Sequence, residues 1–332
     1  MNTFSVVIAT RNRATLLADT LEALARQDWP ADRFEVIVAD NGSTDDTPYV
    51  VADAARRRGA PLVRYLFVPA PGKSAAVNQA LLLATGEYIA FTDDDVRPES
   101  EWLRRLAAAF VETGADFVAG RVKPIWEVPP PDWLSPSVYG VIAVPDNGDA
   151  RLAITSTQHQ VVPIGANMAV RADVVQQIGG LRVDLGKLDG SLRTGEDHEF
   201  FLRMLHAGCR GIYEPTALVH HRVGSERLER GYFRRWLHQN GRDVARLNFA
   251  YSRPDLPRLL RAPRYLWRQA ASDTFSAVRA IARRDPAKSF GASGRLIWFA
   301  GYLREAWFGK GSSLVSPASE TTKTSPFASQ AS

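Results

Sequence analysis

The sequence contains a single cysteine, Cys209, among 332 residues. One thiol excludes a disulfide framework and a cysteine-rich metal site, and it favours a reducing compartment. No stretch of roughly 18 apolar residues is without charged residues, so no segment is predicted to span a membrane. The first ten residues have no basic segment followed by a long apolar run, and we therefore expect no signal peptide.

The overall composition is that of a globular protein, but the charge is unevenly distributed. Hydrophobic residues make up 45% and charged residues 23%, which excludes wholesale disorder and fibrous repeats. Residues 1–220 hold 21 Lys and Arg against 28 Asp and Glu, a net charge of −7, whereas residues 221–310 hold 19 against 7, a net charge of +12. The second region is therefore expected to face an anionic partner, either a membrane surface or nucleic acid.

Short apolar runs and amphipathic segments alternate over the first 120 residues. Residues 4–9 are a β-branched run, and residues 14–27 place Leu17, Leu21 and Leu24 on one helical face. Continuous apolar strands separated by helices indicate a mostly parallel sheet covered on both faces, so the predicted fold class is α/β, doubly wound. The same patterns predict strands at 35–40, 62–68, 87–93 and 116–122, and helices at 47–58, 74–84, 99–113, 171–178 and 196–206.

Polar clusters follow three of these strands, at residues 10–13, 40–46 and 93–95. Ligands bind beyond the carboxyl ends of strands in such sheets, so we expect the clusters to converge on one crevice. Asp40 could accept hydrogen bonds from a base or a ribose, because carboxylate oxygens are acceptors. The alternative for residues 40–43 is a turn that caps the following helix.

Three consecutive carboxylates, Asp93, Asp94 and Asp95, directly follow the strand at 87–93. Adjacent carboxylates repel one another, and a divalent cation is their usual partner. Asp93 and Asp95 point to the same side of an extended chain and could hold Mg²⁺ or Mn²⁺ against phosphates, while Asp94 faces elsewhere. The alternative is a solvated turn in which Asp95 or Glu99 caps the next helix.

Two further regions differ in character from the first 120 residues. Residues 124–150 are rich in proline and contain two tryptophans, which is typical of a binding loop. Residues 232–308 interleave arginine with aromatic residues, a pattern that suits either a membrane interface or helices packed on the rest of the protein with a solvated basic face. Residues 312–332 are rich in Ser, Thr, Ala and Pro, and a disordered tail is predicted there.

Five segments occur in the order and spacing of one known family. They are TFSVVIATRNR, EVIVADNGSTDDT, GKSAAVNQALLLATGEYIAFTDDDVRPESEWL, VPIGANMAVRADVVQQIGGL and TGEDHEFFLRMLHAGCRGIYEPTALVHH. Together they cover residues 3–222 and resemble a family 2 glycosyltransferase with the GT-A fold. The resemblance implies a catalytic domain over residues 1–225, with a nucleotide-binding half at 1–122 and an acceptor half at 123–225. A basic amphipathic helical region would follow at 226–311.

The resemblance also implies roles for individual residues. Asp197 matches the catalytic base, although a carboxylate in the first turn of a helix could equally serve the helix dipole. Lys73 could substitute for an arginine that many relatives have at the position of Val77. Metal binding falls to Asp93, Asp95 and one of His220 and His221, with His220 slightly favoured. Nucleotide binding is expected at Thr10, Arg11, Asn12, Asp40, Asn41, Ser43, Lys73, Asn78, Asp93 and Asp94, and a pocket for the donor sugar and acceptor at Gly165, Ala166, Asn167, Met168, Glu196, Trp126 and Trp133.

The implied activity is that of an inverting glycosyltransferase that depends on Mn²⁺ or Mg²⁺. It would move a sugar from a nucleotide-diphosphate sugar to a glycan or lipid-linked acceptor of cell-envelope synthesis, in the cytoplasm or peripherally on the inner face of the plasma membrane. An anionic membrane surface is a further expected partner, and nucleic acid is not. A catalytically silent GT-A-like subunit is the alternative, but the chain retains both Asp197 and the acidic triplet. A nucleotidyltransferase usually has a glycine-rich first loop, and the loop here is TRNR.

Overall fold

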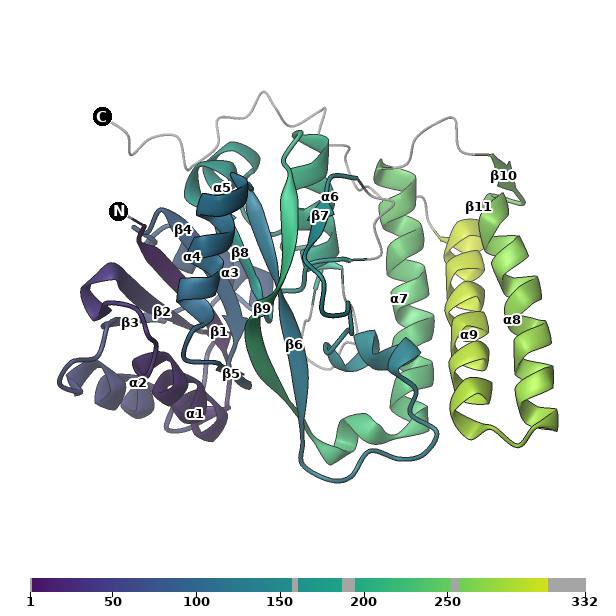
Figure 1. The fold of residues 1–332 in the computed structure, drawn as a ribbon, viewed down its shortest axis with the longest axis horizontal. Coiled ribbons are helices and arrows are strands. Elements are labelled where there is room, and N and C mark those ends of the chain that lie inside the picture. The colour runs from purple at the N-terminus through teal and green to yellow at the C-terminus, as the bar shows by residue number, and fades with distance from the viewer. Residues whose placement is uncertain (1, 157–160, 187–194, 252–256, 310–332) are drawn as a thin grey trace.

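The computed structural model describes residues 2–156, 161–186, 195–251 and 257–309. Its centre is a mixed sheet with the strand order β3-β2-β1-β4-β8-β6-β9-β5, and β7 pairs with β9 (Figure 1). The strands are β1 Phe4–Thr10, β2 Phe34–Asp40, β3 Leu62–Phe67, β4 Tyr88–Asp93, β5 Val96–Pro98, β6 Phe117–Trp126, β7 Leu152–Ile154, β8 Met168–Arg171 and β9 Gly211–Val223. A separate two-stranded ribbon pairs β10 Arg258–Leu259 with β11 Ala262–Pro263.

The first half of the sheet is parallel, as the sequence predicts. β1 pairs in parallel with β2 and with β4, and β2 pairs in parallel with β3. The second half is mixed, because β8 runs antiparallel to both β4 and β6 while β6 and β9 are parallel. β5 and β7 are antiparallel to β9. The predicted α/β class is confirmed.

Helices cover both faces of the sheet, and the sheet separates two layers of hydrophobic core. Helices α1 Ala14–Ala25, α2 Thr47–Arg56 and α4 Trp102–Thr113 pack on one face. Helices α3 Lys73–Leu81, α5 Ala172–Ile178 and α6 Glu196–His206 pack on the other. Alternate residues of each central strand feed the two layers: Val6 and Ile8 of β1 join the first, and Val7 joins the second.

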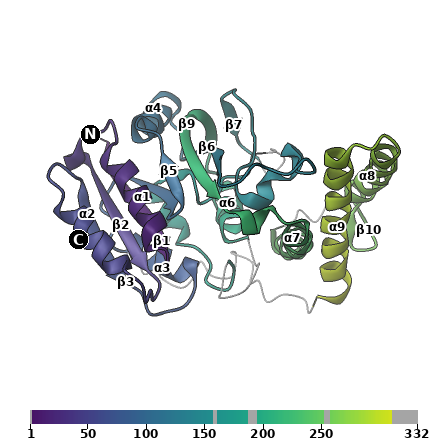
Figure 2. The same ribbon diagram turned by 90° about the horizontal axis from the view of Figure 1, so that it is seen from below.

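The C-terminal helices form a block beside the sheet (Figure 2). They are α7 Arg230–Tyr251, α8 Arg264–Ala282 and α9 Pro286–Phe308. Helix α9 lies between α7 and α8, and α7 adjoins the sheet through the short turns η2 Pro136–Ile142 and η3 Ser225–Leu228. A further short turn, η1 Ala31–Arg33, precedes β2. No helix among the described residues is both long and apolar enough to cross a membrane.

Helices α7 and α9 touch at two glycines. A Cβ atom built on Gly241 of α7 would lie 2.0 Å from the carbonyl oxygen of Trp298, and one built on Gly301 of α9 would lie 2.0 Å from the carbonyl oxygen of His238. Any side chain larger than hydrogen would therefore force the two helices apart. The predicted tail at 312–332 lies outside the described residues.

Candidate active site

The carboxyl ends of the neighbouring strands β1, β2 and β4 lie side by side at one edge of the sheet, and hydrogen bonds join the three polar clusters there. The predicted crevice would lie at this edge. Thr10 Oγ1 donates a hydrogen bond to Asp94 Oδ2 over 2.8 Å, joining β1 to the acidic triplet. The backbone N–H of Asn12 donates to Ser43 Oγ over 2.9 Å, joining β1 to the cluster after β2. Arg11 is exposed at the rim of this loop.

Asp40 and Asn41 shape the side of the crevice that follows β2. The Asp40 carboxylate is fully buried and accepts from the Ser43 N–H over 2.8 Å and from the Tyr65 hydroxyl over 2.7 Å. Burial and this bond raise the pKa of Tyr65 to about 12, so Tyr65 stays a donor. Asn41 Oδ1 accepts from the Gly72 N–H over 2.8 Å and so fixes the loop that leads into α3.

The three carboxylates of the triplet have different surroundings. Asp94 is buried and accepts from Arg13 as well as Thr10, and it does not belong to the candidate metal cluster. It shares the Nη1 group of Arg13 with Asp95, so the prediction that it faces away from both of its neighbours does not hold for Asp95. Burial raises the pKa of Asp94, and the guanidinium of Arg13 opposes that rise. Asp95 Oδ2 lies 2.9 Å from Arg13 and 3.5 Å from Arg227.

Asp93, Asp95 and His221 form a candidate metal site. One ligand atom of each lies within 4.8 Å of the others. Asp95 Oδ1 is buried and accepts no hydrogen bond from the described residues, and it lies 3.4 Å from His221 Nε2. An octahedral ion with bonds of about 2.1 Å brings neighbouring ligand atoms to about 3 Å from each other. Two carboxylates and an imidazole in this arrangement fit a divalent cation.

The slight preference for His220 over His221 is corrected by the structure. Strand β9 alternates, so His221 is buried against the triplet and His220 faces the opposite side. There His220 Nε2 lies 2.6 Å from Glu99 Oε1. The sequence could show that only one histidine faces the crevice, but not which one, because the register of β9 depends on its pairing with β5 and β6.

Lys73 lies between the acidic triplet and the start of α6. Its Nζ is 2.5 Å from Asp93 Oδ1. Burial alone would lower the pKa of Lys73, but the Asp93 carboxylate and then those of Asp197 and Glu196 raise it above its ordinary value. Val77, one turn further along α3, is buried in the core and does not reach the crevice. Lys73 therefore carries the positive charge at this end of α3.

Asp197 is held at the N-terminus of α6. Gly195 precedes the helix with a φ of +116°, and Asp197 Oδ2 accepts the Gly165 N–H over 2.8 Å. A Cβ atom on Gly165 would lie 3.0 Å from Asp197 Oδ1, so a larger residue there would press the carboxylate away from its present position. The Ala166 carbonyl accepts from Thr92 Oγ1 over 3.1 Å, which ties the Gly165 segment to β4 immediately before the triplet.

Three residues that were predicted to contact a ligand make internal contacts of the protein instead. Asn167 is fully buried, accepts from Trp102 Nε1 over 2.8 Å and donates to the Ala217 carbonyl over 2.8 Å. Met168 is buried in the hydrophobic core. Asn78 uses both amide atoms on the backbone of Leu181, each over 2.7 Å. Their predicted ligand contacts are therefore replaced by contacts that hold the site together.

The tryptophans of the 124–150 segment also anchor structure. Trp133 is buried, with its ring centroid 5.2 Å from that of Phe233 in α7 and 4.4 Å from that of Phe290 in α9. Trp126 ends β6 and packs edge-on against Tyr139. Trp133 was predicted to line the pocket for the donor sugar and acceptor, but its ring is buried against Phe233 and Phe290. Local sequence could not show this, because these partners lie a hundred and more residues away along the chain.

Arg13 and Arg227 are the charged residues at the triplet that sequence reasoning did not single out. Arg13 was visible in the TRNR loop, and its charge opposite an acidic cluster was the available signal. Arg227 comes from η3, beyond the segments that resemble the family, and no local pattern marks it. Both lie close to Asp95, so two arginines add their positive charge to that of Lys73 beside the carboxylates.

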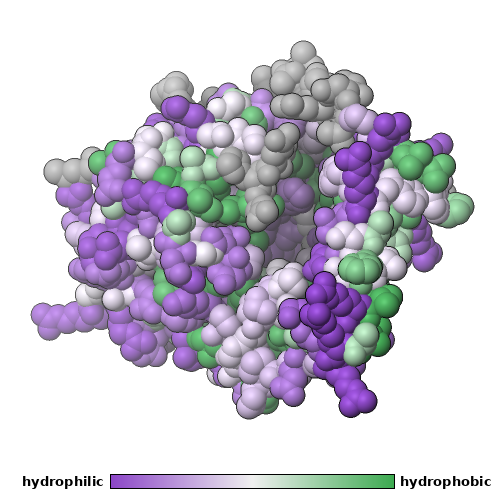
Figure 3. All heavy atoms as spheres, turned by 45° about the vertical axis from the view of Figure 1, so that its right-hand side comes forward, coloured by the Kyte–Doolittle hydropathy of each residue, from purple (hydrophilic) through white to green (hydrophobic). Residues whose placement is uncertain are grey.

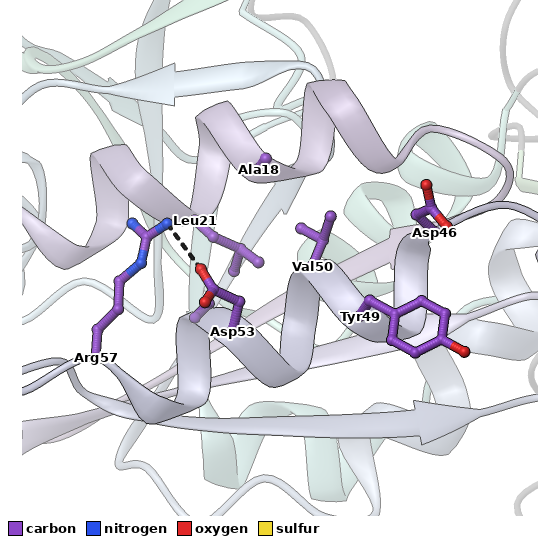
Figure 4. A pocket seen from close by; sticks show the side chains of 8 residues that line it. Ala18, Leu21, Asp46, Tyr49, Val50, Asp53 and Arg57 are labelled. Carbon is purple, nitrogen blue, oxygen red and sulfur yellow. Dashed lines mark hydrogen bonds and ion pairs between the residues drawn. The ribbon is translucent and has the colours of Figure 1, made fainter.

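A separate groove of about 380 Å³ runs between α1 and α2 (Figure 4). Its lining includes Tyr49, Asp53 and Arg57, and Arg57 pairs with Asp53 across one turn of α2. None of the predicted site residues lines it. The crevice at the strand ends is therefore the candidate active site.

A parallel half-sheet with a buried aspartate after β2, an acidic triplet after β4 and a carboxylate at the start of α6 defines a transferase of the GT-A class. The sequence model of glycosyl transferase family 2 matches residues 5–179, more than half of the chain. The chain belongs to that family and is a glycosyltransferase.

Similar proteins agree with this assignment. The succinoglycan biosynthesis protein ExoM of Rhizobium meliloti is 30% identical over 70% of this chain and 71% of its own. The glycosyltransferase AglE of Haloferax volcanii is 28% identical over 61% of this chain, and the chain spans 62% of AglE. The structure of the mannosyltransferase PcManGT of Pyrobaculum calidifontis, solved with GDP-Man and Mn²⁺, matches this chain with a TM-score of 0.63 at 19% identity. The match covers 92% of this chain and 87% of PcManGT, and it supports the fold.

Proposed function

We propose that this glycosyltransferase transfers a sugar from a nucleotide-diphosphate donor with inversion, and that Asp197 is its base. The observation that carries the proposal is the orientation of Asp197. The Gly165 N–H fixes one carboxylate oxygen, and the electrostatic contact through Lys73 links the residue to Asp93. A base must be positioned before its pKa matters, and the Gly165 N–H positions this carboxylate near the positive charge of Lys73.

The proposed reaction uses one carboxylate for one proton. Asp197 takes the proton of an acceptor hydroxyl, the hydroxyl oxygen bonds to the anomeric carbon, and the bond from that carbon to the diphosphate breaks on the opposite face. The nucleoside diphosphate leaves with the electron pair. A divalent cation held by Asp93, Asp95 and His221 would stabilise the charge of that leaving group as a Lewis acid.

The nucleotide side of the donor would bind between β1 and β2. Asp40 retains acceptor capacity, because each carboxylate oxygen can accept more than one hydrogen bond. Arg11, Asn12 and Ser43 lie in the loops that meet there. The binding of GDP-Man and Mn²⁺ by PcManGT supports a nucleotide sugar with a metal for this fold.

The acceptor we propose is a glycan or a lipid-linked intermediate of envelope synthesis, and the enzyme would work peripherally on the inner face of the plasma membrane. The name of ExoM, which places that relative in succinoglycan biosynthesis, supports a polysaccharide acceptor. The net charge of +12 over residues 221–310 supports an anionic surface as a partner.

The proposed base is tested with Asp197→Asn, which keeps the shape of the side chain and removes its basicity. We expect transfer from the preferred donor to fall by about 10²- to 10⁴-fold, the usual contribution of a general base. Asp173→Asn, at an exposed aspartate in the first turn of α5, is the matched control. The donor is first identified with a panel of nucleotide sugars by thermal shift, because a ligand of the folded state raises the midpoint.

Each result of this test decides between the alternatives. Full activity of Asp197→Asn would remove the base assignment, and full activity in the presence of a chelator would remove the metal. A wild-type chain that binds a nucleotide sugar but neither transfers nor hydrolyses it would favour the catalytically silent subunit.

A further inference from the structure

Helix α8 is the outermost element of the C-terminal block (Figure 2). Its inner side packs on α9 through residues such as Ala277 and Ala280, which are buried. Large apolar side chains on its other side are exposed: Phe275 to 70%, Val278 to 62% and Ile281 to 64%. In the space-filling view, hydrophobic and hydrophilic residues lie side by side over these C-terminal helices (Figure 3).

The exposed residues of α8 sort into two adjacent arcs. At 100° per residue, Phe275, Val278 and Ile281 fall on one outer arc. Arg268 and Arg279 fall on the neighbouring outer arc, and the buried residues lie opposite. An apolar arc beside a basic arc is the pattern of a helix that lies in a membrane interface.

Among the described residues, the carboxylates on and around α8 have partners of their own. Asp273 is buried with its Oδ1 2.7 Å from Arg295, and Glu305 is buried with its Oε1 2.7 Å from Arg246. Asp285 caps α9 by accepting the Lys288 N–H over 2.9 Å. The arginines on and just after the outer side of α8 pair with no carboxylate of the described chain; they are Arg264, Arg268, Arg279, Arg283 and Arg284.

A second exposed apolar group lies at the other end of the α8–α9 hairpin. Leu260 is 61% exposed and Phe308 is 78% exposed, and Trp307 joins them by donating its Nε1–H to the Leu260 carbonyl over 2.9 Å. Tyr265 at the start of α8 is also exposed. Apolar side chains therefore occur at both ends of the hairpin, with the arginines of α8 between and beside them.

We propose that the outer face of α8 is the surface by which the enzyme docks on an anionic phospholipid bilayer. Phe275, Val278 and Ile281 insert at the level of the headgroups, and the arginines contact the lipid phosphates. A second copy that docked through the same face would fit poorly, because it would bring the same excess of positive charge to the interface. The inference rests on the proposed peripheral location and assigns that location to particular residues.

The test is co-sedimentation of the full chain with vesicles. The first vesicles are phosphatidylcholine with about one third phosphatidylglycerol, and the second are phosphatidylcholine alone. We expect the wild type to bind the anionic vesicles at least about tenfold more strongly than the neutral ones, and high salt to weaken that binding. The variant Phe275→Asp with Val278→Asp should bind the anionic vesicles at least about tenfold more weakly than the wild type.

A matched control separates the face from the substitution. Val111 on α4 is also an exposed valine, at 69%, and Val111→Asp should leave vesicle binding unchanged. Hydrolysis of the donor without vesicles should be the same in all variants, so loss of membrane binding is distinguished from failure of the proposed catalysis. Equal binding by the wild type and the α8 double variant would overturn the proposal. The proposal would also be overturned if the double variant bound vesicles like the wild type but changed from a dimer to a monomer by light scattering. That result would show that the face of α8 contacts a second copy of the chain.

Discussion

The identity of the histidine at the candidate metal site gives the sharpest test of the proposed active site. His221→Ala should weaken Mn²⁺ binding, because His221 Nε2 lies 3.4 Å from Asp95 Oδ1 and belongs to the cluster whose ligand atoms lie within 4.8 Å. Losing even an outer-shell partner of a metal typically costs 10- to 100-fold in affinity, so removal of a direct ligand should cost about 100-fold or more. That factor corresponds to about 2.7 kcal/mol of binding free energy.

The assay is calorimetric titration of the full chain with MnCl₂ alone, with His220→Ala as the matched control. His220 bonds to Glu99 on the other side of β9, and a surface pair of that kind contributes about 1 kcal/mol or less. We expect His220→Ala to bind Mn²⁺ like the wild type. Equal losses in the two variants, or a loss in His220→Ala alone, would refute the assignment. Thermal midpoints of both variants are measured alongside, because His221 is buried.

Three further outcomes follow from the packing and the charges. Trp133→Ala should lower the free energy of unfolding by about 3–5 kcal/mol, measured by urea denaturation, while the activity of the folded fraction stays near that of the wild type, because its ring contacts Phe233 and Phe290 rather than the crevice. Tyr251→Phe should cost about 1–2 kcal/mol by the same measurement, since the Tyr251 hydroxyl donates to the fully buried carboxylate of Glu199 in α6. Burial lowers the pKa of His198 to about 4, so the unfolded chain binds more protons than the folded chain between about pH 6.5 and 4. The free energy of unfolding should therefore fall as the pH is lowered through that window. The variant His198→Gln should lose less of this free energy between about pH 7 and 5 than the wild type does.

The sequence predicts the first half of the sheet well because each element there carries its own periodic pattern. The helix expected at 14–27 spans Ala14–Ala25, and the strand expected at 35–40 spans Phe34–Asp40. The strand expected at 116–122 continues to Trp126, since its outer part is held by pairing with β9 rather than by an apolar run. Strands β5 and β7 have three residues each and are too short for any period to show.

The site was predictable where chemistry and strand ends coincide. Asp93 and Asp95 could be proposed from their position after a strand, and Asp197 from the resemblance to the family; in the structure the charges of Asp93 and Asp197 both act on Lys73. The sequence could not show that Asn167 is a structural residue rather than a pocket residue. Only its partners Trp102 and Ala217 show that its amide holds two strands and a helix together. Such roles depend on long-range contacts that no local pattern encodes.

The paired glycines at the crossing of α7 and α9 have a mechanical consequence. Two helices in backbone contact at Gly241 and Gly301 cannot slide along each other without a clash, so we expect α7 and α9 to move as one rigid unit. Leu247 of α7 packs with Leu202 of α6, the helix whose first turn contains Asp197. A displacement of α8 would therefore be passed through α9 and α7 to the helix that carries Asp197. With α8 on a membrane, as proposed, α7 and α9 would hold Asp197 at a set distance from that membrane.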